Sequence, residues 1–188
     1  MKLHFSGVFS GNPIDLPNQR QVPDAVPFKE PTGEKFPIIA NALSLGIFLL
    51  ATGLAFLRTG NLSFINIFGL VAAVISLFPH EFLHALCFRE DVYFYLYFKK
   101  GMMFVVGSED MSKSHFVIMS LLPNIIFGFI PFSLFMIFPK LSFWGSLGAL
   151  AIGFGAGDYI NVFNALTQMP KGAVAYMYQM ETYWHKKQ

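Results

Sequence analysis

The chain has 188 residues, of which 54% are hydrophobic and 13% are charged. Soluble domains carry about 25% charged residues, so this composition excludes an ordinary water-soluble enzyme and favours a polytopic membrane protein. A formal net charge of +2 without a dense basic patch argues against a nucleic-acid binder, and the single cysteine, Cys87, excludes an internal disulfide or a cysteine-rich metal site.

Residues 1–36 form a proline-rich arm. Six of the eleven prolines lie between Pro13 and Pro37, spaced four to six residues apart. This spacing prevents a helix and favours an extended chain. The arm has no apolar run long enough for a signal peptide. We expect a non-membrane segment, with a disordered tail as the alternative.

Four apolar segments follow the arm, and a span needs ~20 apolar residues. They cover residues 37–57, 62–88, 115–138 and 141–169. The sequence therefore predicts an all-α polytopic membrane protein with four transmembrane helices, its membrane domain covering residues 37–169. The remaining residues, 170–188, mix aromatic side chains with lysines and are interpreted as an interfacial cytoplasmic tail.

An alternating pattern separates the second and third segments. Tyrosines at 93, 95 and 97 alternate with apolar residues, which is the period of a strand. Lys99-Lys100-Gly101 is suited to a turn, so the sequence predicts a β-hairpin over residues 92–106. The alternative is an ordinary loop of interfacial aromatic residues.

The distribution of lysine and arginine predicts the orientation. Eleven of these residues fall in the arm, the 89–114 loop and the tail, whereas the opposite side has only Arg58 and Lys140. The excess of positive charge on one side predicts that both termini are cytoplasmic.

The second segment contains the motif His80-Glu81-Phe82-Leu83-His84. Charged groups at bilayer depth cost at least ~2.5–3.5 kcal/mol and need a partner or a function. On a helix, His80 and His84 lie one above the other and can bind one Zn²⁺, while Glu81 can act on water as a general base. The alternative is a polar cluster that joins helices.

A catalytic zinc usually has three protein ligands, so a third is needed. Asp158 is the only acidic residue of the fourth segment, and its depth agrees with that of the histidines within one to two turns. Zinc, two neutral imidazoles and the carboxylates of Glu81 and Asp158 sum to zero charge, which lowers the cost of burial. Glu109, Asp110 and His115, near the 89–114 loop, remain alternatives.

Other residues are expected to support the site. Pro79 removes a backbone hydrogen bond and is expected to kink the helix before His80. Asn124 and Asn161 are candidates to orient a ligand or to contact substrate, or they join helices without a role in chemistry. A ridge of small residues, Gly145, Ala149, Gly153 and Gly157, is expected to bring Asp158 close to its neighbours.

The sequence resembles the putative zincin peptidases, a family of small, mostly bacterial membrane proteins. The resemblance rests on the 80–84 motif in an apolar helix, the aromatic hairpin after it, and Gly157-Asp158-Tyr159 in a later helix. It is more distantly similar to site-2 proteases, although Tyr159 stands where that family has glycine. The resemblance implies His80, His84 and Asp158 as metal ligands, Glu81 as the base, and a bacterial plasma membrane.

We therefore predict an integral-membrane zinc metallopeptidase that acts on a peptide or a membrane protein. A non-catalytic, metal-containing membrane adaptor or scaffold is the alternative. A metal transporter is disfavoured, because one compact acidic site offers no relay of ionisable groups to the other face.

Overall fold

The computed structural model describes residues 2–30 and 35–187. It is 55% helix and 18% strand and contains two β-sheets, so the protein is mixed α/β and the prediction of an all-α fold is wrong. The predicted 92–106 hairpin is confirmed, but most other strands come from the arm and the tail, for which the sequence predicts no sheet.

The chain divides into two compact units, each made from separate stretches of sequence. The first, called the sheet unit, contains residues 2–30, 81–120 and 161–187. The second, called the helical unit, contains residues 35–80 and 121–160. The divisions fall inside three helices, so each of these helices begins in one unit and ends in the other.

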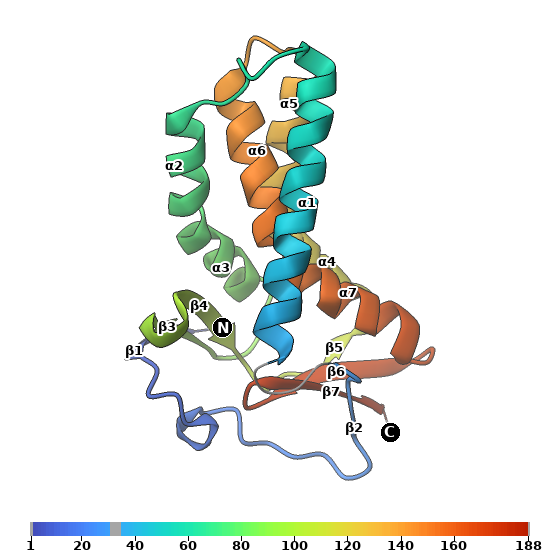
Figure 1. Ribbon diagram of the computed structural model, residues 1–188. Coiled ribbons are helices and arrows are strands. Elements are labelled where there is room, and N and C mark those ends of the chain that lie inside the picture. The colour runs from blue at the N-terminus through green and yellow to red at the C-terminus, as the bar shows by residue number, and fades with distance from the viewer. Residues whose placement is uncertain (1, 31–34, 188) are drawn as a thin grey trace. The chain divides into compact units, whose positions relative to one another are not determined.

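The helical unit is built from apolar helices (Figure 1). They are α1 (Lys35–Thr59), α2 (Ile67–Ile75), the start of α3 (Leu77–Leu86), the end of α4 (Lys113–Pro123), the π-helix η3 (Asn124–Phe129), α5 (Ile130–Ile137), α6 (Ser142–Phe154) and the start of α7 (Ala156–Gln168). The small-residue helix α6 packs against α1, α2 and α5. A Cβ on Gly148 would lie 2.4 Å from the backbone nitrogen of Phe132, so the close approach of α6 and α5 requires glycine there.

Three helices in the described part of the chain are long and apolar enough to cross a membrane: Lys35–Thr59, Ile67–Leu86 and Lys113–Ile137. The fourth predicted span, residues 141–169, is not one helix. It breaks at Gly155 into α6 and α7, which have 13 residues each. The prediction of four transmembrane helices is therefore wrong, because hydropathy does not detect a helix break inside an apolar segment.

The sheet unit contains two sheets (Figure 1). The first has the order β1-β3-β4, from β1 (Leu3–Val8), β3 (Val92–Tyr97) and β4 (Met102–Val106), with the short helix η2 (Phe98–Lys100) at the hairpin turn. The second has the order β2-β7-β6-β5, from β2 (Val26–Pro27), β7 (Glu181–Lys186), β6 (Ala173–Tyr178) and β5 (Met111–Ser112). The predicted interfacial tail is thus the β6–β7 hairpin.

The proline-rich arm is part of this unit. It supplies β1, β2 and the short helix η1 (Pro13–Asp15). Between these elements, Asn18 exchanges two hydrogen bonds with the Gln179 backbone, and Arg20 forms an ion pair with Asp110 at 3.1 Å. Residues 2–30 of the arm are therefore attached to the sheet unit and are mostly extended, residues 35–36 already belong to α1, and the rest of the arm lies outside the described residues.

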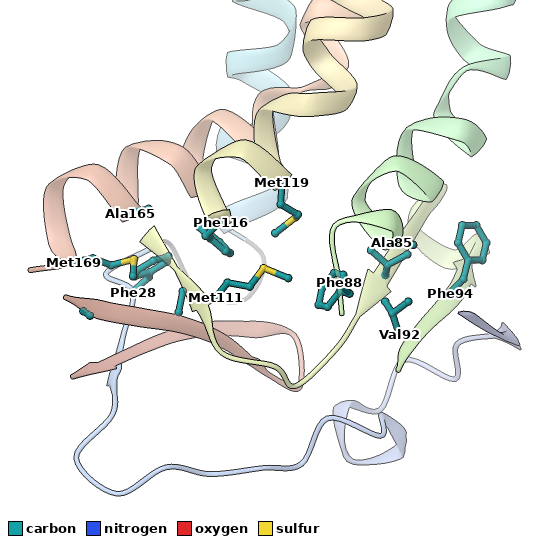
Figure 2. Packing of buried hydrophobic residues seen from close by; sticks show 13 residues of the cluster. Phe28, Ala85, Phe88, Val92, Phe94, Met111, Phe116, Met119, Ala165 and Met169 are labelled. Atoms are coloured by element: carbon teal, nitrogen blue, oxygen red, sulfur yellow. The ribbon is translucent and has the colours of Figure 1, made fainter. Parts of the chain in front are cut away.

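One buried cluster joins the elements of the sheet unit (Figure 2). Phe28 of the arm packs with Phe116 of α4, while Ala85 of α3 packs with Val92 of β3 in the same cluster. Both sheets thus share a core with the ends of α3 and α4.

Candidate metal centre

The residues of the His-Glu-x-x-His motif lie together on α3. One ligand atom from each of His80, Glu81 and His84 lies within 4.8 Å of the others. Both histidines are buried, with exposed fractions of 8% and 6%, and Glu81 is partly exposed. This arrangement follows from the helix, because residues four apart share one face.

A break in the helix precedes the motif. The apolar segment from Ile67 to Leu86 is interrupted at Ser76, which separates α2 from α3. Pro79 has no N–H to donate to the carbonyl four residues earlier, which explains an interruption at this point. The helix resumes with a hydrogen bond from His80 N to Ser76 O at 2.9 Å.

The ring of His84 is oriented by a backbone carbonyl. Its Nδ1 lies 2.9 Å from Met119 O. Because a carbonyl only accepts hydrogen bonds, Nδ1 carries the hydrogen, and Nε2 of the neutral ring keeps its lone pair. Pro123 lies four residues after Met119 within the same helix and cannot donate to this carbonyl. The proline thereby leaves Met119 O without its helical donor.

Asp158 lies on α7 beside His80. The distance from His80 Nε2 to Asp158 Oδ2 is 3.1 Å, and both side chains are largely buried. Two ligands of a tetrahedral zinc ion, each ~2.0–2.1 Å from the metal, lie about 3.3 Å apart. The spacing of this nitrogen and this oxygen therefore fits two ligands of one ion. The depth argument for Asp158 rests on a continuous fourth span, which the break at Gly155 shows to be wrong.

Asn124 contacts the same carboxylate. Its Nδ2 donates to Asp158 Oδ2 at 2.7 Å, and its side chain is only 1% exposed. Asn124 is the first residue of the π-helix η3, and such helical irregularities are frequent at functional sites. This hydrogen bond joins η3 to α7, and the role of Asn124 at the site stays a prediction. Asn161, three residues further along α7, is partly buried, and its role stays a prediction.

Gly155 is a site residue that the sequence analysis missed. A Cβ at this position would lie 1.8 Å from Asn124 Oδ1. Asn124 therefore occupies the space that any larger residue at 155 would fill. The ridge expected to bring Asp158 close ends in Gly157, but a Cβ on Gly157 would meet nothing within 4 Å. One glycine among several in an apolar run gives no signal that would single it out.

The two acidic alternatives to Asp158, which are Glu109 and Asp110, have other partners. Glu109 is buried and accepts hydrogen bonds from the backbone nitrogens of Arg89 and Glu90 at 2.6 and 2.7 Å. Although burial acts to raise it, the pKa of Asp110 is lowered by its hydrogen bonds with Arg20 and His185. Both carboxylates thus stabilise loops of the sheet unit.

The fold indicates membrane association by the length and composition of three helices, and the site contains a His-Glu-His group that could hold a metal ion. Residues 73–174 match the model of a family described as putative zincin peptidase, which is more than half of the chain. The chain therefore belongs to the putative zincin peptidase family. This membership indicates a metallopeptidase, and the zincin class implies zinc. No curated protein and no solved structure matches the chain.

Proposed function

We propose that the protein is an integral-membrane zinc metallopeptidase in which His80, His84 and Asp158 bind the metal and Glu81 is the general base. The observation that carries this proposal is the 3.1 Å approach of Asp158 Oδ2 to His80 Nε2, next to a His-Glu-x-x-His helix. The three helices suited to crossing a membrane support the location. The substrate is a peptide segment or a membrane protein.

The ligand set fits zinc in its chemistry. Imidazole nitrogens and a carboxylate oxygen are ordinary zinc ligands, and three protein ligands leave one position open for catalysis. Two of the proposed ligands have a partner that orients them: the Met119 carbonyl orients His84, and the Asn124 amide orients Asp158. Such partners fix the direction of the ligand atoms and strengthen binding.

The residues of the proposed site have separate roles in hydrolysis. A zinc ion bound here would act as a Lewis acid that acidifies water and polarises the peptide carbonyl. Glu81 accepts the proton of the attacking water and delivers it to the nitrogen of the leaving amine. The buried ligands and the surrounding apolar helices limit the access of bulk water to the reacting groups.

Substitution of Glu81 tests the proposal. Wild type and Glu81→Gln are expressed in cells, and new N-termini in the membrane fraction are measured by terminal labelling and mass spectrometry. We expect Glu81→Gln to keep zinc and to lose proteolysis by roughly 10²–10⁴-fold. Glu90→Gln, which changes an exposed glutamate outside the motif, is the control and should behave as wild type. Undiminished proteolysis by Glu81→Gln would contradict the proposal.

A further inference from the structure

The turn of the β3–β4 hairpin exposes apolar side chains. Phe98 is 70% exposed and Met102 is 40% exposed, one on each side of the lysines and glycine of the turn. Val8 of β1 pairs with Leu96 of β3 and is 62% exposed. We call Phe98–Met102 the hairpin tip. Exposed apolar side chains on both sides of one turn, with a further one on the adjoining strand, indicate a surface that binds a partner.

The charges of the hairpin tip indicate what kind of partner it binds. Lys99 and Lys100 follow Phe98 directly, and residues 92–106 contain no acidic residue. The Lys99 ammonium donates to Ser10 O at 3.3 Å, and the Lys100 ammonium lies 5.9 Å from the centre of the Tyr97 ring. Aromatic side chains beside lysines are typical of membrane interfaces, and lysines near the surface attract anionic headgroups.

Within the sheet unit, the hairpin packs in one cluster with the last residues of one candidate span and the first residues of another. Val92 and Phe94 of β3 belong to the same buried cluster as Ala85, near the end of Ile67–Leu86, and Phe116, near the start of Lys113–Ile137 (Figure 2). A six-residue strand such as β3 is about 20 Å long. Within the sheet unit, the hairpin tip therefore lies about one strand length from the residues that pack on the end of α3 and the start of α4.

We propose that the hairpin tip inserts into the surface of a bilayer that carries anionic phospholipids. Phe98 and Met102 enter the boundary between headgroups and acyl chains, and Lys99 and Lys100 contact the phosphates. The inference rests on the membrane location in the proposed function: with the spans in the bilayer, insertion is an intramolecular step, for which a small apolar surface suffices. It concerns residues outside the metal centre, so its failure would leave the proposed zinc ligands and general base standing.

A single fluorophore on the full chain tests this inference. Cys87 is the only cysteine, so Cys87→Ser gives a background for Phe98→Cys labelled with an environment-sensitive dye. The protein is reconstituted into vesicles of phosphatidylcholine, with and without phosphatidylglycerol. We expect blue-shifted emission and quenching by nitroxide lipids, both stronger with phosphatidylglycerol. Each lysine near an anionic surface contributes roughly fivefold to partitioning, so Lys99→Gln with Lys100→Gln should lower the inserted-to-free ratio roughly 30-fold.

Met180 provides a matched control at another hairpin turn. It is 38% exposed between β6 and β7, and its neighbour is Glu181 rather than a lysine. A label on Met180→Cys should stay in a water-like environment in both lipids. Water-like emission from the Phe98 position in both lipids would overturn the inference, as would equal quenching at both positions. If the label at position 98 is quenched equally with and without phosphatidylglycerol, and equally in the lysine variants, the proposed role of the lysines is wrong.

Discussion

Asn124 Nδ2 donates across 2.7 Å to the Asp158 oxygen that lies 3.1 Å from His80 Nε2. The π-helix η3 and α7 thus meet at one carboxylate beside the His-Glu-x-x-His helix. A hydrogen bond of this kind holds the carboxylate oxygen in place. The position of the proposed third ligand therefore depends on a residue that would not itself bind the metal.

Gly155→Ala should disrupt this arrangement. The new methyl group would lie 1.8 Å from Asn124 Oδ1, so Asn124 would have to move and Asp158 would lose its donor. Loss of an orienting partner of a ligand usually lowers metal affinity about 10–100-fold, and we expect a decrease in this range. Zinc affinity is measured by competition with a chelator of known affinity.

Gly157→Ala is the matched control for that substitution. It adds the same methyl group two residues away, in the first turn of α7, where nothing lies within 4 Å of the added carbon. We expect wild-type zinc affinity for Gly157→Ala. Equal affinities for the two variants would show that Asn124 does not position the site.

The ionisable residues of the candidate metal centre could be singled out from sequence because they carry charge. His80, Glu81, His84 and Asp158 stand out because ionisable groups are rare in apolar segments. Gly155 and the Met119 carbonyl do not stand out, since one is a glycine among many and the other is backbone. Pro123 carries a usable signal, because a proline within a helix frees the carbonyl four residues before it, which here orients His84.

Phe28→Ala tests whether the proline-rich arm is part of the folded core. Phe28 is 5% exposed and packs on Phe116, so its truncation should lower the free energy of unfolding by about 3–5 kcal/mol. Ile14→Ala, in the same arm, removes a side chain that is 72% exposed and should change stability by no more than about 0.5 kcal/mol. Unfolding is followed in detergent by circular dichroism. Similar small effects of both substitutions would mean that the arm is loosely attached.

Glu30 should make the stability of the sheet unit depend on pH. Burial and the neighbouring carboxylate of Glu181 raise the pKa of Glu30 to about 7. A hydrogen bond from the Thr182 backbone acts in the opposite direction and lowers this pKa, but its effect is smaller. The folded state thus prefers the protonated acid. Its contribution to stability is fully present below the usual pKa of 4.5 and is lost as the pH rises through about 7.

Glu30→Gln replaces the acid with a neutral group at every pH. We expect it to raise the melting temperature relative to wild type above pH 7, and to have little effect below pH 4.5. Thermal unfolding measured across this range checks the prediction. The control is Glu90→Gln, which changes an exposed glutamate of the same unit. An effect of Glu30→Gln that is the same at both ends of the range would contradict this interpretation.

The sheets were only partly predictable for a physical reason. The alternation over residues 92–97 carries the strand period, and the antiparallel pairing of Tyr93 with Val106 follows from it and from the turn. In contrast, β2 has two residues, and the register of β1 on β3 depends on contacts between residues about 90 positions apart. Local patterns do not encode such pairings. The sequence therefore predicts where the arm and the tail lie along the chain, but not that they form strands of a sheet.

The zinc content of purified protein tests the central claim most directly. Elemental analysis should find about one zinc ion per chain in wild type and in Glu81→Gln, and a large loss in His80→Ala, His84→Ala and Asp158→Ala. Asp110→Asn, which changes a carboxylate that pairs with Arg20, should keep its zinc. If Asp158→Ala retained full zinc stoichiometry and full activity, Asp158 would not be the third ligand and the account of this site would be wrong.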